Sequence, residues 1–379
     1  AVNSGYAVVA VASAMGDSTD DLLKMTNSFD LRKCKPELDI LLASGEQLST
    51  SLLTMALNSS GIQASAFTAA KTGIITDDTH GSASIRKINT AAIRECLQHD
   101  TVAVVAGYQG ITDKQEITTL GRGGSDTTAV ALAAALHAER CDIYTDVDGI
   151  YSADPRCCST SLRLENVSLV EMLAMANAGA HVMCAQAMEI AHEKNLPLRV
   201  RSVFKPEDLG TLISSEERPM PFTGIASNSQ QDVFVVHSGS SLKELSKLHL
   251  LLQNARELSM QVETVRRVGK RHEFKAYISV SNHYVQNAKT ALEHMAEDLG
   301  LKMEHSRTLS KVSIIGSFDN TNDVLQRAWS TLFKHSIIPR FWSKQDGISL
   351  SVWLPHEEAN QAIDILHEKF IHDSLKIPA

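Results

Sequence analysis

Residues 118–130 read Thr-Thr-Leu-Gly-Arg-Gly-Gly-Ser-Asp-Thr-Thr-Ala-Val, a glycine-rich turn that runs into an alanine-rich helix. The apolar run 102–107 precedes it and suits a strand that delivers the chain to a loop at the edge of a sheet. The first amides of such a helix have no helical partner, and the helix dipole adds partial positive charge there. Arg122 supplies a full positive charge in the turn. The stretch therefore predicts a site for a phosphate or a carboxylate in an α/β fold.

Composition limits the classes of protein to consider. The chain has 379 residues, 43% of them hydrophobic, so we expect two or three folded domains. The net charge is −8 and no basic run is interleaved with aromatic residues, so we expect neither a nucleic-acid nor a membrane partner. No apolar run reaches the roughly 18 residues that a membrane span needs. Six cysteines without a Cys-x-x-Cys pair indicate reduced thiols and a cytoplasmic location.

The chain divides into two regions with different patterns. From 1 to 213, apolar runs alternate with helical patterns, which predicts a largely parallel sheet flanked by helices. The polar, proline-bearing stretch 214–221 reads as a linker. From 222 to 379 we expect two small α+β units of the ferredoxin-like type. Their expected elements are strand 232–237, helix 241–257, strands 260–267 and 273–280, helix 285–299 and strand 302–308, then strand 311–316, helix 320–335, strands 337–342 and 347–354, and helix 357–370.

Two further groups of polar residues carry candidate chemistry. Residues 145–156 read Thr-Asp-Val-Asp-Gly-Ile-Tyr-Ser-Ala-Asp-Pro-Arg and follow an apolar strand, where open α/β sheets bind ligands. By itself this stretch is more typical of a charged surface turn. Ser44, Gly45 and Glu46 stand at the expected head of a long helix, where Glu46 would simply complement the helix dipole.

Taken together, these strings resemble the aspartate kinases of the amino acid kinase family. The matching segments are 11–16 (Val-Ala-Ser-Ala-Met-Gly), 42–47 (Leu-Ala-Ser-Gly-Glu-Gln), 118–128 and 144–156. The region 222–379 resembles a pair of ACT units, which 311–316 and 350–354 match best. The resemblance implies an amino acid kinase domain with the parallel sheet of carbamate kinases, followed by two ferredoxin-like ACT units.

The resemblance implies the transfer of the γ-phosphoryl group of ATP, with Mg²⁺, to the side-chain carboxylate of L-aspartate. The product would be 4-phospho-L-aspartate, the first intermediate of lysine, threonine and methionine synthesis. A carboxylate is already ionised at neutral pH, so the reaction needs positive charge to bring two anions together rather than a general base.

The resemblance also assigns roles by position. Arg122 would pair with an aspartate carboxylate, and Glu46 would receive the substrate ammonium. Asp126 would orient the reacting groups or the metal, and Ser13 and Ser125 would lie near the acceptor. The nucleotide would be held by Thr145, Asp146, Tyr151, Arg156 and His181. No side chain is assigned as a fixed metal ligand, and packing roles for Thr145 and Tyr151 stay open.

The sequence departs from the family pattern in several places. The family begins with a strand that bears a Lys-Phe-Gly-Gly motif, whereas this sequence opens at the expected second strand, so we expect that it comes from a longer protein. His181 stands where the family has lysine, and 184–186 stands where it has His-Pro-Arg, which predicts weaker ATP binding. The ACT turns 238–244 and 317–323 lack an Asp-Pro-Gly motif, which argues against feedback control by lysine or threonine.

Two other functions remain open at this stage. The chain could be a catalytically impaired relative that binds a ligand as a regulatory or assembly subunit, or a kinase of another small carboxylate such as glutamate or acetylglutamate. The ACT pair would bind an amino-acid effector or serve only for assembly. A homodimer or higher homo-oligomer is expected, because paired ferredoxin-like sheets offer edges for joining.

Overall fold

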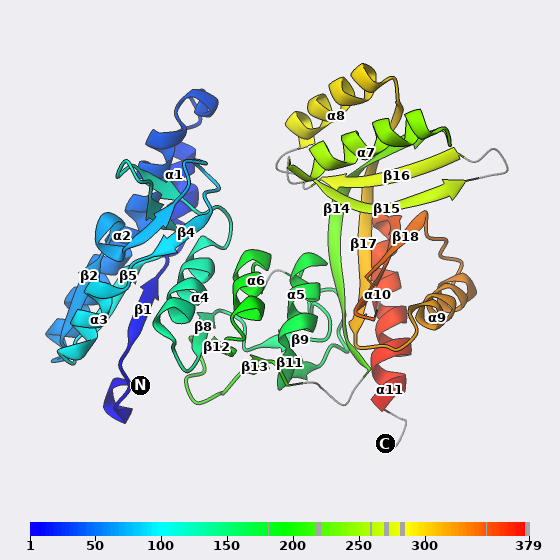
Figure 1. The fold of residues 1–379 in the computed structure, drawn as a ribbon. Coiled ribbons are helices and arrows are strands. Elements are labelled where there is room, and N and C mark those ends of the chain that lie inside the picture. Colours follow the sequence, from blue (N-terminus) through cyan, green and yellow to red (C-terminus); the bar gives the residue numbers. More distant parts are fainter. Residues whose placement is uncertain are drawn as a thin grey trace. The chain divides into compact units, whose positions relative to one another are not determined.

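The computed structural model describes residues 1–180, 182–216, 221–257, 260–268, 273–280, 285–345 and 347–375 (Figure 1). Its contacts divide the chain into two compact units, each described below by itself. Unit 1 comprises Ala1–Gly149 and His181–Glu216, and unit 2 comprises Ile150–Ala180 and Glu217–Ala379. The sequence suggested one boundary at 214–221. The structure also groups Ile150–Ala180, from the expected kinase region, with the C-terminal residues.

Unit 1 has a parallel sheet at its core, as the sequence predicted. Strand β5 (Val102–Ala106) lies between β1 (Val9–Ala12) and β2 (Ala64–Phe67) and is parallel to both. All five residues of β5 are buried, which explains its unbroken apolar run. A second sheet pairs β12 (Leu198–Ser202) with β8 (Cys141–Thr145) in parallel, and β13 (Thr211–Ser214) is antiparallel to β12.

Unit 1 also contains a small four-stranded sheet that the sequence pattern did not reveal. Its order is β4-β3-β6-β7, and each strand has only three or four residues. Such short strands give too little alternation to be recognised from sequence. The bounds are β3 Ile74–Thr76, β4 Ile85–Ile88, β6 Gln109–Ile111 and β7 Ile117–Thr119.

Helices surround these sheets. They are α1 (Ser18–Met25), α2 (Lys35–Ser59), α3 (Ala91–Gln98), α4 (Gly124–Leu136) and α6 (Ala185–Glu193), with short 3₁₀ turns at Val2–Ser4, Leu31–Lys33 and Ala69–Thr72. The position expected for Ser44–Glu46 was wrong, because α2 begins at Lys35 with a proline in its first turn. These residues therefore lie in the middle of the helix, and Glu46 cannot act as a charge at its N-terminus.

Helix α2 is long and apolar enough to cross a membrane by length and composition alone, although 28% of its most apolar window is buried in the fold. It packs on β2, β5 and β7 of unit 1. Two of its acidic residues, Asp39 and Glu46, are buried there and hydrogen-bonded to neighbouring segments. These contacts show that one face of α2 packs against the sheets of unit 1.

Unit 2 begins with a hairpin and a helix. The hairpin pairs β9 (Ile150–Tyr151) with β10 (Arg163–Leu164). Strand β11 (Asn166–Ser168) leads into α5 (Leu169–Asn177), which starts with a reciprocal capping box between Ser168 and Glu171.

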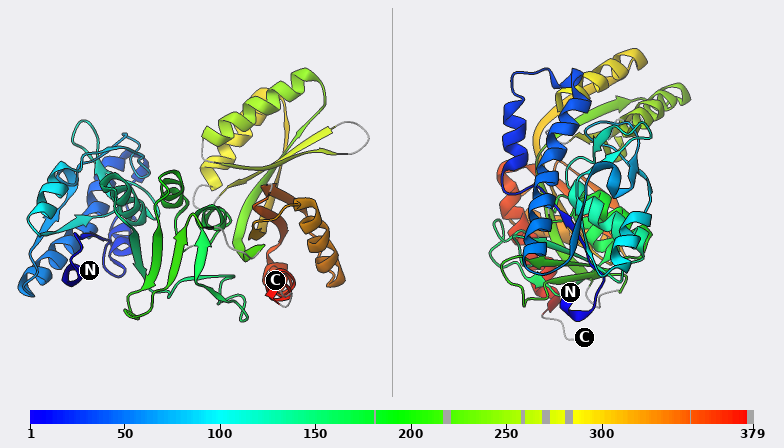
Figure 2. Two further views of the ribbon diagram at one scale, coloured as in Figure 1. Left: turned by 60° about the horizontal axis from the view of Figure 1, so that its bottom comes forward. Right: turned by 90° about the vertical axis from the view of Figure 1, so that its left-hand side faces the viewer.

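The rest of unit 2 is one six-stranded sheet in the order β15-β16-β14-β17-β19-β18 (Figures 1 and 2). Its strands are β14 Phe222–Ser238, β15 Gln261–Val268, β16 Glu273–Val280, β17 Lys302–Gly316, β18 Phe341–Gln345 and β19 Ser349–Pro355. Helices α7 (Leu242–Glu257) and α8 (Val285–Leu299) contact each other, as do α9 (Thr321–Lys334) and α10 (Ala359–His367). Helix α10 continues through the turn Glu368–His372 to the short helix Asp373–Leu375.

The two expected ferredoxin-like units therefore share long strands. The segments expected as separate strands 302–308 and 311–316 form the single strand β17, and 232–237 is only the second half of β14. Register shifts between β14 and β17 near Gln231 allow both strands to continue through a region of polar residues. The two halves keep separate cores, one around Phe234 and Leu251 and the other around Ile314 and Leu366.

Candidate functional site

The glycines of the turn before α4 are each required by geometry. Gly121 and Gly123 have φ of 76° and 72°, a left-handed conformation that other residues rarely adopt. A Cβ on Gly123 would lie 2.4 Å from Cβ of Cys184, and one on Gly124 would lie 2.7 Å from Cδ2 of Tyr108. The sequence Gly-Arg-Gly-Gly therefore brings the backbone of the turn against two neighbouring segments.

A second helix begins beside this turn. Cys184 is the N-cap of α6, and its thiol donates a hydrogen bond to the carbonyl oxygen of Gly123 over 3.3 Å. The same sulfur lies 3.3 Å from Oγ1 of Thr127 in the first turn of α4. The amino-terminal ends of α4 and α6 thus meet at Gly123, which concentrates partial positive charge where an anion would bind.

Two serines assigned to the site by sequence lie together. Oγ of Ser125 donates to Oγ of Ser13 over 3.2 Å. A Cβ on Gly107, just after β5, would lie 2.7 Å from Oγ of Ser125 and 3.1 Å from the carbonyl oxygen of Ala12. The ends of β1 and β5 therefore approach the first turn of α4 closely, and the lack of a side chain at Gly107 permits this approach.

Glu46 reaches the same place from the middle of α2. Its Oε1 accepts a hydrogen bond from the amide of Ala14, next to Ser13, over 3.2 Å. The residue is only 3% exposed, and burial raises the pKa of its carboxyl group. Its Oε2 is buried and has no hydrogen-bond partner among the residues that the structure describes. A buried carboxylate oxygen left in this state is costly, so a cation or hydrogen-bond donor beside it would lower the free energy of the site.

Asp126 occupies the first turn of α4, directly after Ser125. Burial raises the pKa of its carboxyl group to about 6. A carboxyl group with this pKa is still mostly ionised at pH 7, although its charge is poorly solvated. Such a group binds a cation more favourably than an exposed aspartate, because the cation replaces missing hydration.

Arg122 lies between the two left-handed glycines and is exposed. An exposed guanidinium beside two helix N-termini can reach a dissolved anion and form a bidentate pair with it. At the end of β8, Oγ1 of Thr145 donates to Oδ1 of Asp146 over 2.9 Å. Unit 1 thus carries Ser13, Glu46, Arg122, Ser125, Asp126, Thr145 and Asp146.

Two of the remaining nucleotide candidates belong to unit 2. Tyr151 and Arg156 belong to the β9–β10 hairpin of unit 2, and Tyr151 is paired with Arg163 in its ladder. The guanidinium of Arg156 donates to both carboxylate oxygens of Asp154, at 3.0 and 2.7 Å. His181 lies outside the described residues.

A buried network behind the glycine turn was missed by sequence reasoning. The carboxylate of Asp39 on α2 accepts hydrogen bonds from Oγ1 of Thr119 at 2.6 Å and from the amide of Gly81 at 3.1 Å. Its Oδ2 also lies 2.8 Å from Nδ1 of His80. The only sequence signal was that Asp39 and Glu46 are seven residues apart, which places both on one face of the helix.

No group of three or more His, Cys, Asp and Glu side chains suited to a metal occurs among the described residues. All six cysteines are free thiols.

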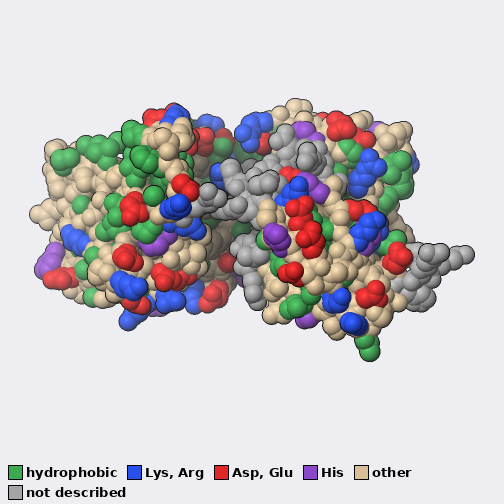
Figure 3. All heavy atoms as spheres, turned by 90° about the horizontal axis from the view of Figure 1, so that it is seen from above, with side chains coloured by type: hydrophobic (Ala, Val, Ile, Leu, Met, Phe, Trp, Pro, Cys, Tyr) green, Lys and Arg blue, Asp and Glu red, His purple; other side chains and the backbone are tan. Residues whose placement is uncertain are grey.

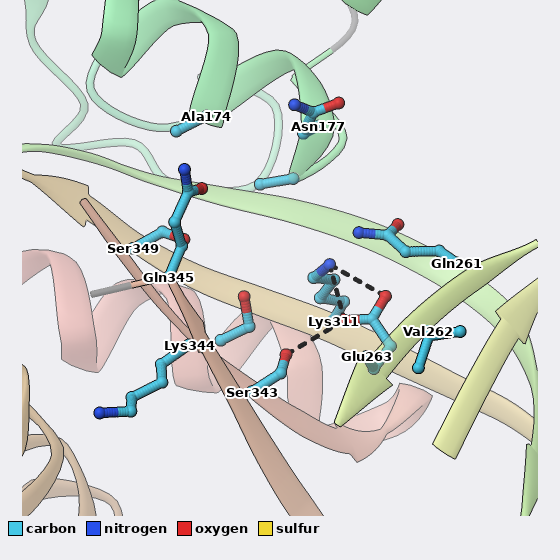
Figure 4. Close-up of a pocket in the computed structure, with 12 residues that line it drawn as sticks. Ala174, Asn177, Gln261, Val262, Glu263, Lys311, Ser343, Lys344, Gln345 and Ser349 are labelled. Atoms are coloured by element: carbon cyan, nitrogen blue, oxygen red, sulfur yellow. Dashed lines mark hydrogen bonds and ion pairs between the residues drawn. The ribbon is translucent and has the colours of Figure 1, made fainter. Parts of the chain in front are cut away.

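Unit 2 has a polar pocket of its own, with a volume of about 160 Å³, between the end of α5 and strands β15, β17, β18 and β19 (Figure 4). At its base Nζ of Lys311 lies 3.0 Å from Oε2 of Glu263, and both side chains are buried. Glu263 also accepts hydrogen bonds from Ser279 and Ser343. Since this carboxylate is fully satisfied by the chain, we assign the pair to the packing of β15 against β18 and not to ligand binding.

Comparison with known proteins agrees with this geometry. Residues 1–202 match the amino acid kinase family. Aspartokinase 2 of Bacillus subtilis is 38% identical over 371 residues, which cover 97% of this chain and 90% of that protein. The fold resembles E. coli aspartokinase III in complex with aspartate and ADP (R-state), with a TM-score of 0.77 at 24% identity, over 93% of this chain and 79% of that one. The E. coli enzyme in complex with lysine and aspartate (T-state) gives a TM-score of 0.65 at 26% identity, with the same coverage.

The chain therefore belongs to the amino acid kinase family. Its group within that family is that of the aspartokinases, which it matches over nearly its whole length, so the aspartate kinase function expected from the motifs is confirmed. The expected fold, a parallel-sheet kinase domain followed by ferredoxin-like regulatory units, is confirmed as well.

Proposed function

We propose that the chain transfers the γ-phosphoryl group of ATP to the β-carboxylate of L-aspartate and releases 4-phospho-L-aspartate and ADP. The observation that carries the site assignment is the buried Oε2 of Glu46, which has no hydrogen-bond partner among the described residues. The other oxygen of the same carboxylate accepts a hydrogen bond from the amide of Ala14, the residue after Ser13. The α-ammonium group of aspartate is the cation that this oxygen would bind. Arg122 would then pair with a carboxylate of the same substrate.

Positive potential at the reacting groups is the main catalytic requirement. The attacking carboxylate and the γ-phosphate repel each other, and the amino-terminal ends of α4 and α6 with Arg122 offset that repulsion. The hydroxyl groups of Ser13 and Ser125 would donate to the acceptor carboxylate and hold it in line for attack. We assign Thr145, Asp146, Tyr151, Arg156 and His181 to the nucleotide.

Mg²⁺ fits this site as an ion carried by the nucleotide. It commonly uses one or two carboxylates together with phosphate oxygens and waters, and the buried, poorly solvated carboxyl group of Asp126 suits that role. When bound, Mg²⁺ would neutralise charge on the phosphate oxygens. Asp126 itself would orient the reacting groups through its fixed place in the first turn of α4.

The product is an acyl phosphate, and we place it at the start of lysine, threonine and methionine synthesis in the cytoplasm. The free thiols of all six cysteines suit that compartment.

An assay of aspartate-dependent hydroxamate formation tests this function. The wild-type chain should form hydroxamate with aspartate, and Arg122→Ala should lower kcat/KM by about 10² to 10³. Arg94→Ala, an exposed arginine on α3, is the matched control. A wild-type protein that binds ATP and aspartate without turnover would instead be the impaired regulatory subunit, and turnover with glutamate or acetylglutamate in place of aspartate would reassign the substrate.

We propose that feedback control by lysine or threonine is weak. The amino-terminal ends of both leading helices of the regulatory unit are already capped by the chain. Glu244 and Ser241 form reciprocal hydrogen bonds at α7, and Oδ1 of Asn320 accepts from the amides of Asn322 and Asp323 at α9. The Glu244 carboxylate would repel the carboxylate of an amino-acid effector. Tight calorimetric binding of lysine or threonine would contradict this proposal.

We also propose a homo-oligomer. The end strands β15 and β18 contact each other within the chain at Glu263 and Ser343, so part of the sheet edge is already used. Helix α2 exposes Ile40, Leu48 and Met55, each by more than half, and Figure 3 shows hydrophobic side chains gathered on the face of unit 1 that it draws. Light scattering should give a mass above that of one chain, and Leu48→Lys should lower it.

A further inference from the structure

The hairpin that carries Tyr151 and Arg156 is built into the core of the regulatory unit. Residues 150–164 group with the C-terminal residues rather than with the preceding strand β8. Ala153 and Cys158 of the hairpin are buried in the same core as Leu366 and Phe370 of the C-terminal helical segment. The candidate nucleotide residues of this hairpin are therefore held by the regulatory sheet and its last helix.

Ser152, the residue after Tyr151, makes the hydrogen bonds that connect the hairpin to the regulatory sheet and its last helix. Its carbonyl oxygen accepts a hydrogen bond from the amide of Ile225 on β14 over 2.6 Å. A Cβ on Gly224 would lie 2.5 Å from the same oxygen, so this glycine allows β14 to approach. The Oγ of Ser152 accepts from the amide of Leu162 across the hairpin, over 2.9 Å.

One side chain of α10 completes this connection. His367 is fully buried, and its Nε2 lies 2.8 Å from Oγ of Ser152. Its Nδ1 lies 3.4 Å from Oγ1 of Thr160, and Nε2 of His372 lies 3.1 Å from the carbonyl oxygen of Thr160. A neutral imidazole has one acceptor and one donor, so His367 can accept from Ser152 while it donates to Thr160. The C-terminal helical segment thus bonds to both arms of the hairpin.

We propose that His367 is a positioning residue for the nucleotide, which acts through Ser152 to fix the hairpin bearing Tyr151 and Arg156. A displacement of α10 in the regulatory unit would then move the hairpin and change the affinity for ATP, with little effect on aspartate. This inference rests on the proposed function, because it takes the hairpin to be part of the nucleotide site.

The competing interpretation is that His367 is only a satisfied histidine of the core. In that case its replacement would lower the free energy of unfolding and leave the KM for ATP of the folded protein unchanged. The two interpretations differ in KM, and not in stability.

The variants Ser152→Ala, His367→Phe and His367→Gln separate these interpretations. His367→Phe keeps an aromatic ring of similar size without the hydrogen bonds, and His367→Gln restores a donor and an acceptor. His335→Ala, an exposed histidine at the end of α9, is the matched control. We would measure kcat and the KM values for ATP and aspartate in the hydroxamate assay, the Kd for ATP by calorimetry, and the melting temperature.

We expect Ser152→Ala and His367→Phe each to raise the KM and the Kd for ATP about tenfold, with the KM for aspartate within about twofold of wild type. The double variant Ser152→Ala/His367→Phe should bind ATP as tightly as the single variant with the lower ATP affinity, because the two substitutions remove the same hydrogen bond. His367→Gln should recover part of the affinity. ATP affinities within twofold of wild type in folded variants would overturn the inference.

If His367→Phe fails to fold, the Kd of Ser152→Ala for ATP tests the inference by itself. A rise of about tenfold supports it, and a value within twofold of wild type overturns it. A wild-type protein that binds ATP without phosphorylating aspartate contradicts the proposed function and leaves the ATP affinities of the variants to judge this inference. A wild-type protein that binds no ATP overturns both.

Discussion

The hydroxyl of Ser125 donates to the hydroxyl of Ser13 over 3.2 Å, although 112 positions separate the two residues in sequence. This contact places the end of β1 against the first turn of α4. The carboxylate of Glu46 bonds to the amide of Ala14, the residue after Ser13, so the site draws on three separate segments. Each segment carries one of the motifs that identified the family.

Replacing Glu46 tests the ammonium site. Glu46→Gln removes the charge but keeps a hydrogen-bonding group, so we expect the KM for aspartate to rise about 10- to 100-fold while the KM for ATP changes little. Thermal unfolding should show no loss of stability, because the carboxylate is buried with one oxygen lacking a partner among the described residues. Glu37→Gln, on the exposed first turn of α2, should leave both KM values unaltered.

The pKa of Asp126 predicts an acid limb in the activity profile. Since burial raises this pKa to about 6 in the free protein, log kcat/KM should rise with pH up to about 6 and level off above it. Asp126→Asn should lower kcat by about 10² to 10³ and remove that limb. The free energy of unfolding should change with pH in the opposite direction to activity. Because the raised pKa makes Asp126 bind its proton in the folded state before the unfolded state does, this group stabilises the fold increasingly as pH falls from about 6 to below 4. A profile that is flat through pH 6 in the wild-type enzyme would contradict the assignment.

We expect position 123 to require glycine because Cys184 lies close to it, and not only because of its backbone conformation. Gly61 and Gly123 both have left-handed φ, of 82° and 72°, but a Cβ on Gly61 would meet no atom within 4 Å. Gly61→Ala should lower the free energy of unfolding by about 1 kcal/mol, the usual penalty of the backbone conformation. Gly123→Ala should cost more than about 3 kcal/mol and lower ATP affinity, because α6 must move away from the turn. If urea unfolding showed that the two variants lose the same free energy of unfolding, the close contact with Cys184 would contribute nothing to the requirement for glycine.

Acid should destabilise unit 2 through His367. Burial, and then the nearby His372, lower its pKa to about 4, while Asp364 and Glu368 act in the opposite direction. The unfolded chain therefore binds a proton near pH 6.5 that the folded chain does not bind until about pH 4, so stability present above pH 6.5 falls by up to about 3 kcal/mol as pH drops to 4. In His367→Phe, this part of the pH dependence of the melting temperature should disappear. His335→Ala should retain it.

Breaking the ion pair in the pocket should be far more harmful than removing it. Lys311→Met leaves the carboxylate of Glu263 buried without its cation and should cost about 3 to 5 kcal/mol, whereas Lys311→Met/Glu263→Leu should recover much of the loss. Differential scanning calorimetry of the two variants measures this difference. If Lys311→Met instead kept wild-type stability and lost affinity for an amino acid, the pocket would be a ligand site.

The reaction could be predicted from the sequence motifs, because each motif combines a local backbone requirement with a charged side chain. The left-handed glycines at 121 and 123 and the helix that follows were predictable from Gly-Arg-Gly-Gly-Ser-Asp. Most helices of unit 1 were also predictable, because their apolar positions repeat at the period of a helix. The roles of Arg122 and the nucleotide residues remain predictions.

Other features depended on partners distant in sequence. The buried bonds of Asp39 to Thr119 and Gly81 could not be foreseen, because neither partner is near it in the chain. The strand β17 was expected as two strands, because its middle is polar. It is a single strand because its backbone pairs with β14 and β19 across that polar region.

The sequence by itself determined the class of the protein, the glycine turn, its charges and the alternation that makes a parallel sheet, because these follow from backbone conformation and periodicity within short windows. Only the tertiary structure decided that Glu46 reaches Ala14 from the middle of a helix and that Ser152 is bound by His367 of the regulatory unit. Burial and hydrogen bonding between remote segments arise when packing excludes water from them, and no local pattern records which segments will meet.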